Sequence, residues 1–131
     1  MAGKRITLKS ALAVIALVSA PLTTVAEEIA APVWGDVSAI FQERCVMCHS
    51  AVSGATKGLR LDDYAALMRG SAQGVVLKKG DPKASILIRR LRGEIAPRMP
   101  FLSRALSEDQ IALIERWIEM GMPESRGRVF P

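Results

Sequence analysis

The sequence predicts a small all-α fold of about four helices, and three observations support this fold class. Apolar residues recur at helical spacing in several segments, with capping residues before these segments and glycines after them. No stretch alternates apolar and polar residues as a half-buried strand would, and no segment repeats. With 131 residues, the chain has enough material for one domain.

The first 26 residues are predicted to be a cleaved secretory signal peptide. The segment begins with the basic residues Lys4, Arg5 and Lys9, continues through the apolar run 11–20, and ends in small residues before Glu27. This run is shorter than the roughly 20 residues that a helix needs to span a bilayer. We therefore expect a soluble periplasmic or otherwise exported protein, with no stable membrane span after cleavage.

Cleavage also changes the charge of the chain. The full sequence has a formal charge of +5, but three of its 18 basic residues lie in the signal segment and all 13 acidic residues lie after it. The mature chain of 105 residues therefore carries a formal charge of only +2. A chain this close to neutrality lacks the basic surface that nucleic-acid binding requires, so no nucleic-acid partner is predicted.

The mature chain divides into three predicted parts. Residues 27–35 mix alanine, proline and glycine without a period and are expected to form an extended lead-in. The folded domain is expected over residues 36–122, followed by a C-terminal tail over residues 123–131. Asp36 is the expected cap of a first helix whose apolar residues continue up to Cys45.

Two short helices are predicted in the middle of the chain. Asp62 is the expected cap of the second helix, and Gly70 its expected end. Asp81 is followed by Pro82, a cap followed by proline at the first helical position, so the third helix is expected to begin there and to run to about Arg92.

A proline-containing segment separates these helices from the last one. Residues 94–103 contain two prolines and cannot form a continuous helix. Ser107 and Gln110 then form a capping box, which predicts a last helix that ends at Gly121.

Residues 45–49 read Cys-Val-Met-Cys-His, which is the signature of covalent haem attachment. The thiols of Cys45 and Cys48 are separated by about one helical turn, so each can add to one of the two haem vinyl groups. His49 follows directly and is placed to donate a ring nitrogen to the iron. The motif predicts one covalent haem c.

Two other chemistries share the Cys-x-x-Cys spacing. A disulfide oxidoreductase motif follows a strand in a βαβ unit, whereas a helix is predicted before Cys45. A structural zinc site needs a fourth cysteine or histidine ligand, and the chain has only two cysteines and one histidine. The haem interpretation is therefore favoured. A protein without haem, in which Cys45 and Cys48 cycle between dithiol and disulfide, remains an alternative.

The second axial ligand of the iron must come from a residue other than histidine, because His49 is the only one. Lysine, water or an empty position are possible, but methionine is favoured. Met1 leaves with the signal, and Met47 lies between the two cysteines and cannot reach the far face. Met99 is the preferred ligand among the remaining candidates because it lies in a stiff, irregular segment between two prolines. The other candidates are Met68, Met120 and Met122.

From the first helix to the last, the chain resembles a class I cytochrome c domain, particularly the monohaem cytochrome c modules of planctomycetes and other bacteria. The order of attachment motif, methionine loop and terminal helix is the same. The resemblance covers about residues 36–121. It rests on Gly58–Asp62, Gly80–Leu87, Arg98–Pro100, Leu106–Ile111 and Arg116–Ile118.

The resemblance implies a small cytochrome c-like fold of about four helices wrapped around one covalently bound haem. It also implies that the first and last helices cross with an aromatic residue from each at the contact, here Phe41 and Trp117. Two further residues are candidates for haem contacts. Arg60 is a candidate partner of a haem propionate through a charge-assisted hydrogen bond, and Phe101 is a candidate to pack on the haem edge.

These features predict an electron-transfer protein rather than an enzyme. It would pass single electrons between redox partner proteins, either as a free carrier or as the small subunit of an oxidoreductase. The alternative is a haem enzyme or gas-binding sensor in which the sixth iron position is open. Arg89, Arg90 and Arg92 are interpreted either as a contact for an acidic redox partner or as a solvated helix end.

Overall fold

The structure is a computed structural model that describes residues 1, 3 and 30–126. Apart from residues 1 and 3, the predicted signal peptide lies outside the described residues, as does the end of the chain from residue 127. Within residues 30–126 the chain contains four α-helices, one short 3-10 turn and no strand, which confirms the predicted all-α class. The elements are α1 (Trp34–Arg44), the 3-10 turn η1 (Thr56–Gly58), α2 (Tyr64–Arg69), α3 (Ile86–Leu91) and α4 (Glu108–Glu119).

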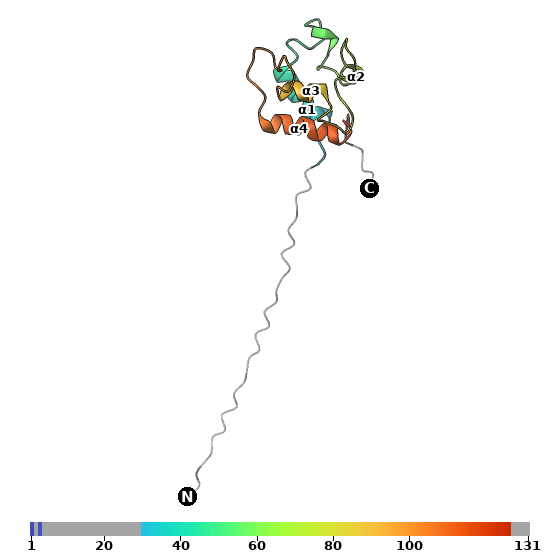
Figure 1. The fold of residues 1–131 in the computed structure, drawn as a ribbon. Helices are drawn as coiled ribbons and strands as arrows, with labels where there is room; N and C mark the ends of the chain where they lie inside the picture. The colour runs from blue at the N-terminus through green and yellow to red at the C-terminus, as the bar shows by residue number, and fades with distance from the viewer. Residues whose placement is uncertain (2, 4–29, 127–131) are drawn as a thin grey trace.

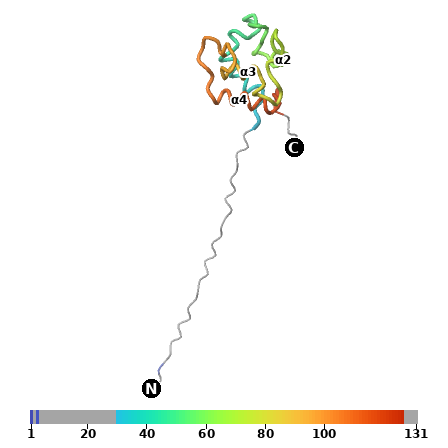
Figure 2. The backbone as a smooth tube through the Cα atoms, in the orientation of Figure 1, coloured from blue at the N-terminus to red at the C-terminus, as the bar shows by residue number. Residues whose placement is uncertain are grey.

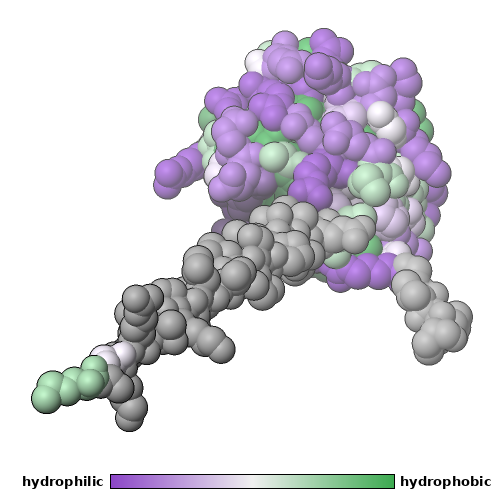
Figure 3. Space-filling model, turned by 90° about the horizontal axis from the view of Figure 1, so that it is seen from below, coloured by the Kyte–Doolittle hydropathy of each residue, from purple (hydrophilic) through white to green (hydrophobic). Residues whose placement is uncertain are grey.

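Helices α1, α3 and α4 form the centre of the domain. Helix α4 packs against both α1 and α3, and α2 lies to one side of this group (Figure 1). The chain between α3 and α4, orange in Figure 2, arches along the side of the domain away from α2. Every helix in the described part of the chain is too short or too polar to traverse a bilayer. The face seen in Figure 3 is covered mainly by hydrophilic residues.

An aromatic cluster joins α1, α2 and α4. The side chains of Phe41 and Trp117, which were predicted to mark the helix crossing, are both fully buried. The ring of Trp34 lies 5.9 Å from each of them, measured between ring centroids, and 5.8 Å from the ring of Tyr64. Trp34 therefore extends the expected pair into a cluster of four aromatic rings.

The residues after α4 fold back onto this cluster. The carbonyl oxygen of Pro123 accepts hydrogen bonds from the backbone N–H of Trp34 at 2.9 Å and from the indole N–H of Trp117 at 3.0 Å. The carbonyl oxygen of Met122 accepts from the hydroxyl of Tyr64 at 2.8 Å. These three hydrogen bonds fix the end of the domain to the beginning of α1 and of α2.

Helix α1 begins earlier than the sequence predicts. Asp36 is not the cap but the third residue of the helix, and its carboxylate accepts a hydrogen bond of 2.8 Å from the backbone N–H of Val33. A carboxylate in the first turn can satisfy an unpaired N–H from inside the helix, as the second half of a capping box does. The helix therefore extends back to Trp34 although Val33 has no capping side chain.

The middle helices also start later than predicted. Asp63, not Asp62, caps α2, because its carboxylate accepts from the N–H of Ala66 at 2.7 Å. Asp81 caps only a turn by accepting from Ala84 at 3.0 Å, and α3 begins at Ile86. The predicted capping box of the last helix is present, and α4 begins directly after its first residue.

Candidate haem site

A cavity of about 860 Å³ opens between the end of α1, the segment before α3, α3 itself and the loop that follows α3. Its size lies within the range of about 300–1,000 Å³ that is usual for cofactor sites. Apolar side chains from several distant segments form most of its walls. They include Phe41, Leu59, Leu61, Val76, Leu87 and Leu91.

Both cysteines of the attachment motif line this cavity. The backbone continues past α1 in a further turn, in which the N–H of Cys45 donates to the carbonyl of Phe41 at 2.8 Å and that of Cys48 to the carbonyl of Cys45 at 3.1 Å. This turn directs the two thiols to one site, as the spacing predicts, and both thiols are free. Burial raises the pKa of Cys45 to about 11, and this effect exceeds that of the positive charge of Arg44, which lowers the pKa.

His49 is oriented by the segment that follows the loop over residues 50–58. Its ring Nδ1 lies 3.3 Å from the carbonyl oxygen of Leu59, and its own carbonyl oxygen accepts from the N–H of Leu61 at 2.8 Å. With the proton on Nδ1 donated to Leu59, Nε2 is the nitrogen that remains to bind a metal. The sequence analysis missed the role of Leu59, because a backbone carbonyl has no residue-type signal.

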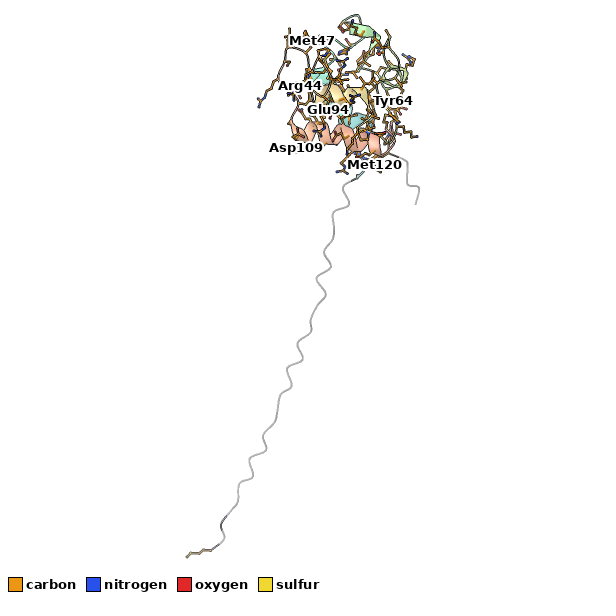
Figure 4. The ribbon with its side chains drawn as sticks, viewed as in Figure 1. Arg44, Met47, Tyr64, Glu94, Asp109 and Met120 are labelled. Carbon is orange, nitrogen blue, oxygen red and sulfur yellow. The ribbon has the colours of Figure 1, made fainter. Side chains whose placement is uncertain are left out.

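Two methionines of the described chain line the cavity, namely Met47 and Met99. Met68 packs on the hydrophobic core, and Met122 is buried beside the aromatic cluster. Met120 is 60% exposed at the end of α4, far from Met47 in Figure 4. The structure thus brings Met99 into one cavity with both cysteines and His49, and leaves the other candidate methionines, Met68, Met120 and Met122, outside its lining.

Arg60 and Phe101 occupy different environments. Phe101 lines the cavity and is 62% exposed, so it is positioned at the edge of the site. Arg60 is absent from the cavity lining, and its guanidinium forms a two-pronged ion pair with Asp62 at 3.0 and 3.1 Å. This pair lowers the pKa of Asp62 to about 2, with a further contribution from the N–H of Ala51. The contacts of Arg60 and Phe101 with haem stay predictions.

The cations that do line the cavity are Arg44, Lys57 and Arg90. Arg44 ends α1, and its guanidinium donates to the carbonyl of Arg104 at 2.6 Å, which ties α1 to the loop after Met99. In Figure 4, Arg44 and Met47 lie on the side of the domain away from Tyr64.

The residues of the cavity fit a covalently bound haem. Two thiols are available to form thioether bonds, one imidazole nitrogen is oriented for the iron, and one thioether sulfur is available as a second ligand. The apolar walls suit a large, flat and mostly hydrophobic ring.

Comparison with known proteins gives the same assignment. Residues 45–100 match the model of the family described as Planctomycete cytochrome C. No curated protein and no solved structure matches the chain. The matched segment runs from the first cysteine of the attachment motif to the proline after Met99, and so contains all four residues that the sequence analysis assigned to the haem and its iron. Over residues 45–100 the chain is therefore similar to the planctomycete cytochrome C family.

Proposed function

We propose that this protein is an exported monohaem c-type cytochrome that transfers single electrons between redox partner proteins outside the cytoplasm. It works as a free carrier or as the small cytochrome subunit of an oxidoreductase. One observation carries the proposal: a single, mainly apolar cavity is lined by Cys45, Cys48, the only histidine of the chain and Met99.

Each of these residues has a distinct task. Cys45 and Cys48 hold the haem through thioether bonds, and His49 binds the iron through Nε2 because Nδ1 is engaged by Leu59. Met99 would supply the thioether sulfur as a second ligand to the iron. The bound haem supplies the one-electron redox couple, and its potential rises when a thioether rather than a harder ligand completes the coordination.

The walls of the cavity favour electron transfer. Leu61, Val76 and Leu91 are at least nine-tenths buried and form an apolar wall of the site. A hydrophobic shell that limits solvent access raises the cost of the more highly charged oxidised state and so tunes the reduction potential. If His49 and Met99 both bind the iron, no coordination position would remain for a substrate, which favours a carrier over an enzyme.

The experiment that tests this proposal is a comparison of oxidised and reduced absorption spectra. The protein is produced in a host that matures c-type cytochromes, together with Met99→Ala and the control Met47→Ala, which removes the other methionine in the cavity lining. We expect a haem c spectrum in all three proteins. The weak near-infrared sulfur-to-iron band of the oxidised form is expected in the wild type and in Met47→Ala, and is expected to be lost in Met99→Ala.

Other results would point to other functions. Binding of carbon monoxide to the reduced wild-type protein, without the near-infrared band in its oxidised form, indicates an open iron position and hence a haem enzyme or gas sensor. A colourless protein with two titratable thiols indicates the disulfide-cycling alternative.

A further inference from the structure

The three arginines at the end of α3, of which Arg89 and Arg90 lie in the helix and Arg92 directly after it, have different neighbours. Arg89 pairs with Glu94 at 3.7 Å, and Arg92 forms a short ion pair with Glu115 at 2.7 Å. Arg90 is half-buried and belongs to the lining of the haem cavity. The group is therefore not a uniform basic patch for a partner protein, and Arg90 is its only member in the cavity lining.

Arg90 contacts the segment before and at Met99 through both its backbone and its side chain. Its carbonyl oxygen accepts a hydrogen bond from the N–H of Met99 at 3.0 Å. Its guanidinium donates to the carbonyl oxygen of Pro97 at 3.1 Å. Arg90 thus holds the chain at two points, Met99 and Pro97.

The segment around Met99 has few other ways to be held. Pro97 and Pro100 have no backbone N–H, so only Arg98 and Met99 can donate backbone hydrogen bonds between residues 97 and 100. The N–H of Met99 is already committed to Arg90. A methionine side chain also has three rotatable bonds and does not fix its own sulfur. Its position therefore depends on how firmly its backbone is anchored.

We infer that Arg90 is a positioning residue for Met99, which holds the methionine segment against the cavity through its guanidinium bond to Pro97. The inference rests on the proposed role of Met99 as an iron ligand. A charged donor bonded to a carbonyl gives a stronger anchor than a neutral one, and this bond, although exposed to solvent, adds a second attachment to the backbone bond at Met99.

The remainder of the loop has separate anchors. The Nε of Arg98 donates to the carbonyl of Leu91 at the longer distance of 3.4 Å, and Arg44 holds the carbonyl of Arg104. Loss of the Arg90 side chain is therefore expected to loosen the segment at Met99 while the domain stays folded.

Three variants separate this role from others. Arg90→Met keeps an unbranched side chain in the cavity wall but has no donor, and Arg90→Lys keeps the charge and one donor group. Arg89→Met is the matched control, since it makes the same change at the neighbouring residue of α3, whose side chain pairs with Glu94 instead. The backbone bond from Met99 to residue 90 is available in all three variants.

The measurement is competition between Met99 and added imidazole for the oxidised iron, followed by the Soret band. Imidazole must displace the methionine, so its apparent affinity reports how firmly the segment is held. We expect Arg90→Met to bind imidazole several-fold more tightly than the wild type, because loss of one solvent-exposed hydrogen bond costs less than the factor of about ten that a shielded charge-assisted bond would give. Arg90→Lys is expected to lie between the two, and Arg89→Met to match the wild type.

A second measurement follows the near-infrared band while the protein is heated. In Arg90→Met the near-infrared band should disappear well below the temperature at which far-ultraviolet circular dichroism shows global unfolding. Equal behaviour of Arg90→Met and Arg89→Met in both measurements overturns the inference but leaves Met99 as the ligand. A lower reduction potential in Arg90→Met with unchanged imidazole affinity overturns it as well, because the side chain then acts only by its charge. A wild-type protein without the band removes both the inference and the proposed ligand.

Discussion

The hydroxyl of Tyr64 donates a hydrogen bond of 2.8 Å to the carbonyl oxygen of Met122, which lies 58 residues further along the chain. Tyr64 is the first residue of α2, and Met122 is buried after the end of α4. The bond joins two parts of the chain that border the aromatic cluster rather than the haem cavity.

Tyr64→Phe removes this bond and keeps the ring. We expect it to lower the free energy of unfolding by about 1 kcal/mol, the usual net worth of one hydrogen bond, with an added cost from the unpaired carbonyl of Met122. Chemical denaturation of the oxidised protein measures this change. The near-infrared band should be unaffected, and its loss would show that the cluster supports the iron site more directly than the contacts indicate.

Asp62 is expected to make stability depend on pH. Its carboxylate, held by Arg60 and by the N–H of Ala51, has a pKa lowered to about 2, chiefly by the bond to Arg60. A carboxylate with a lowered folded-state pKa stabilises the fold above its unfolded pKa of about 3.9, and this contribution is lost as the pH falls toward 2.

The variant Asp62→Asn tests this dependence, because asparagine has nearly the shape of aspartate but carries no charge at any pH. We expect the variant to melt below the wild type at pH 7. The difference in melting temperature should narrow below about pH 4 and close near pH 2. A difference that is the same at every pH would mean that the ion pair with Arg60 contributes nothing.

Gly70 and Gly35 form a matched pair of glycines. Gly70 ends α2 with a φ of +85°, and a Cβ at this residue would lie 2.4 Å from the carbonyl oxygen of Gly74. Gly70→Ala should therefore cost at least about 2 kcal/mol, through backbone strain and displacement of the turn that borders the cavity.

Gly35→Ala is the control for that variant. Gly35 lies exposed in the first turn of α1, and a Cβ there would meet nothing within 4 Å. Replacement by alanine at such a site is expected to raise stability by up to about 0.5–1 kcal/mol. Thermal unfolding of both variants measures the two effects. Similar melting temperatures for both would contradict the close approach of Gly70 to Gly74.

The exported protein is expected to begin at Glu27. Intact-mass spectrometry of protein from the periplasmic fraction would then give the mass of residues 27–131 plus one haem. A mass that includes residues 1–26 would show that the segment is retained as an anchor. A product without the added haem would count against attachment at Cys45 and Cys48.

Local signals in the sequence predicted the parts of the structure that depend on few residues. The capping box at Ser107 and Gln110 is a four-residue pattern with its own hydrogen bonds, and α4 begins where it predicts. The attachment motif likewise needs only five consecutive residues, and the structure directs both thiols and His49 to one cavity. Met99 was the preferred candidate because Pro97 and Pro100 exclude a helix there, and the structure places it in the same cavity, while its role as a ligand stays a prediction.

Features that depend on distant contacts were not predictable in the same way. Asp62 and Asp63 are adjacent and equally able to cap a helix. The carboxylate of Asp62 accepts hydrogen bonds from Arg60 and Ala51, so Asp63 is the residue that caps α2. The beginning of α1 at Trp34 depends on the aromatic cluster and on the carbonyl of Pro123. The carbonyl of Leu59 and the guanidinium of Arg90 act through geometry that no residue pattern records.

The bond between the N–H of Trp34 and the carbonyl of Pro123 has a consequence for how this domain can be linked to others. It places the entry and the exit of the folded chain side by side, and in Figure 1 both lie at the lower edge of the domain. Met47, beside the cavity, lies toward the opposite edge in Figure 4. A neighbouring domain fused at either end would therefore leave from the same edge and keep the mouth of the cavity accessible for electron exchange.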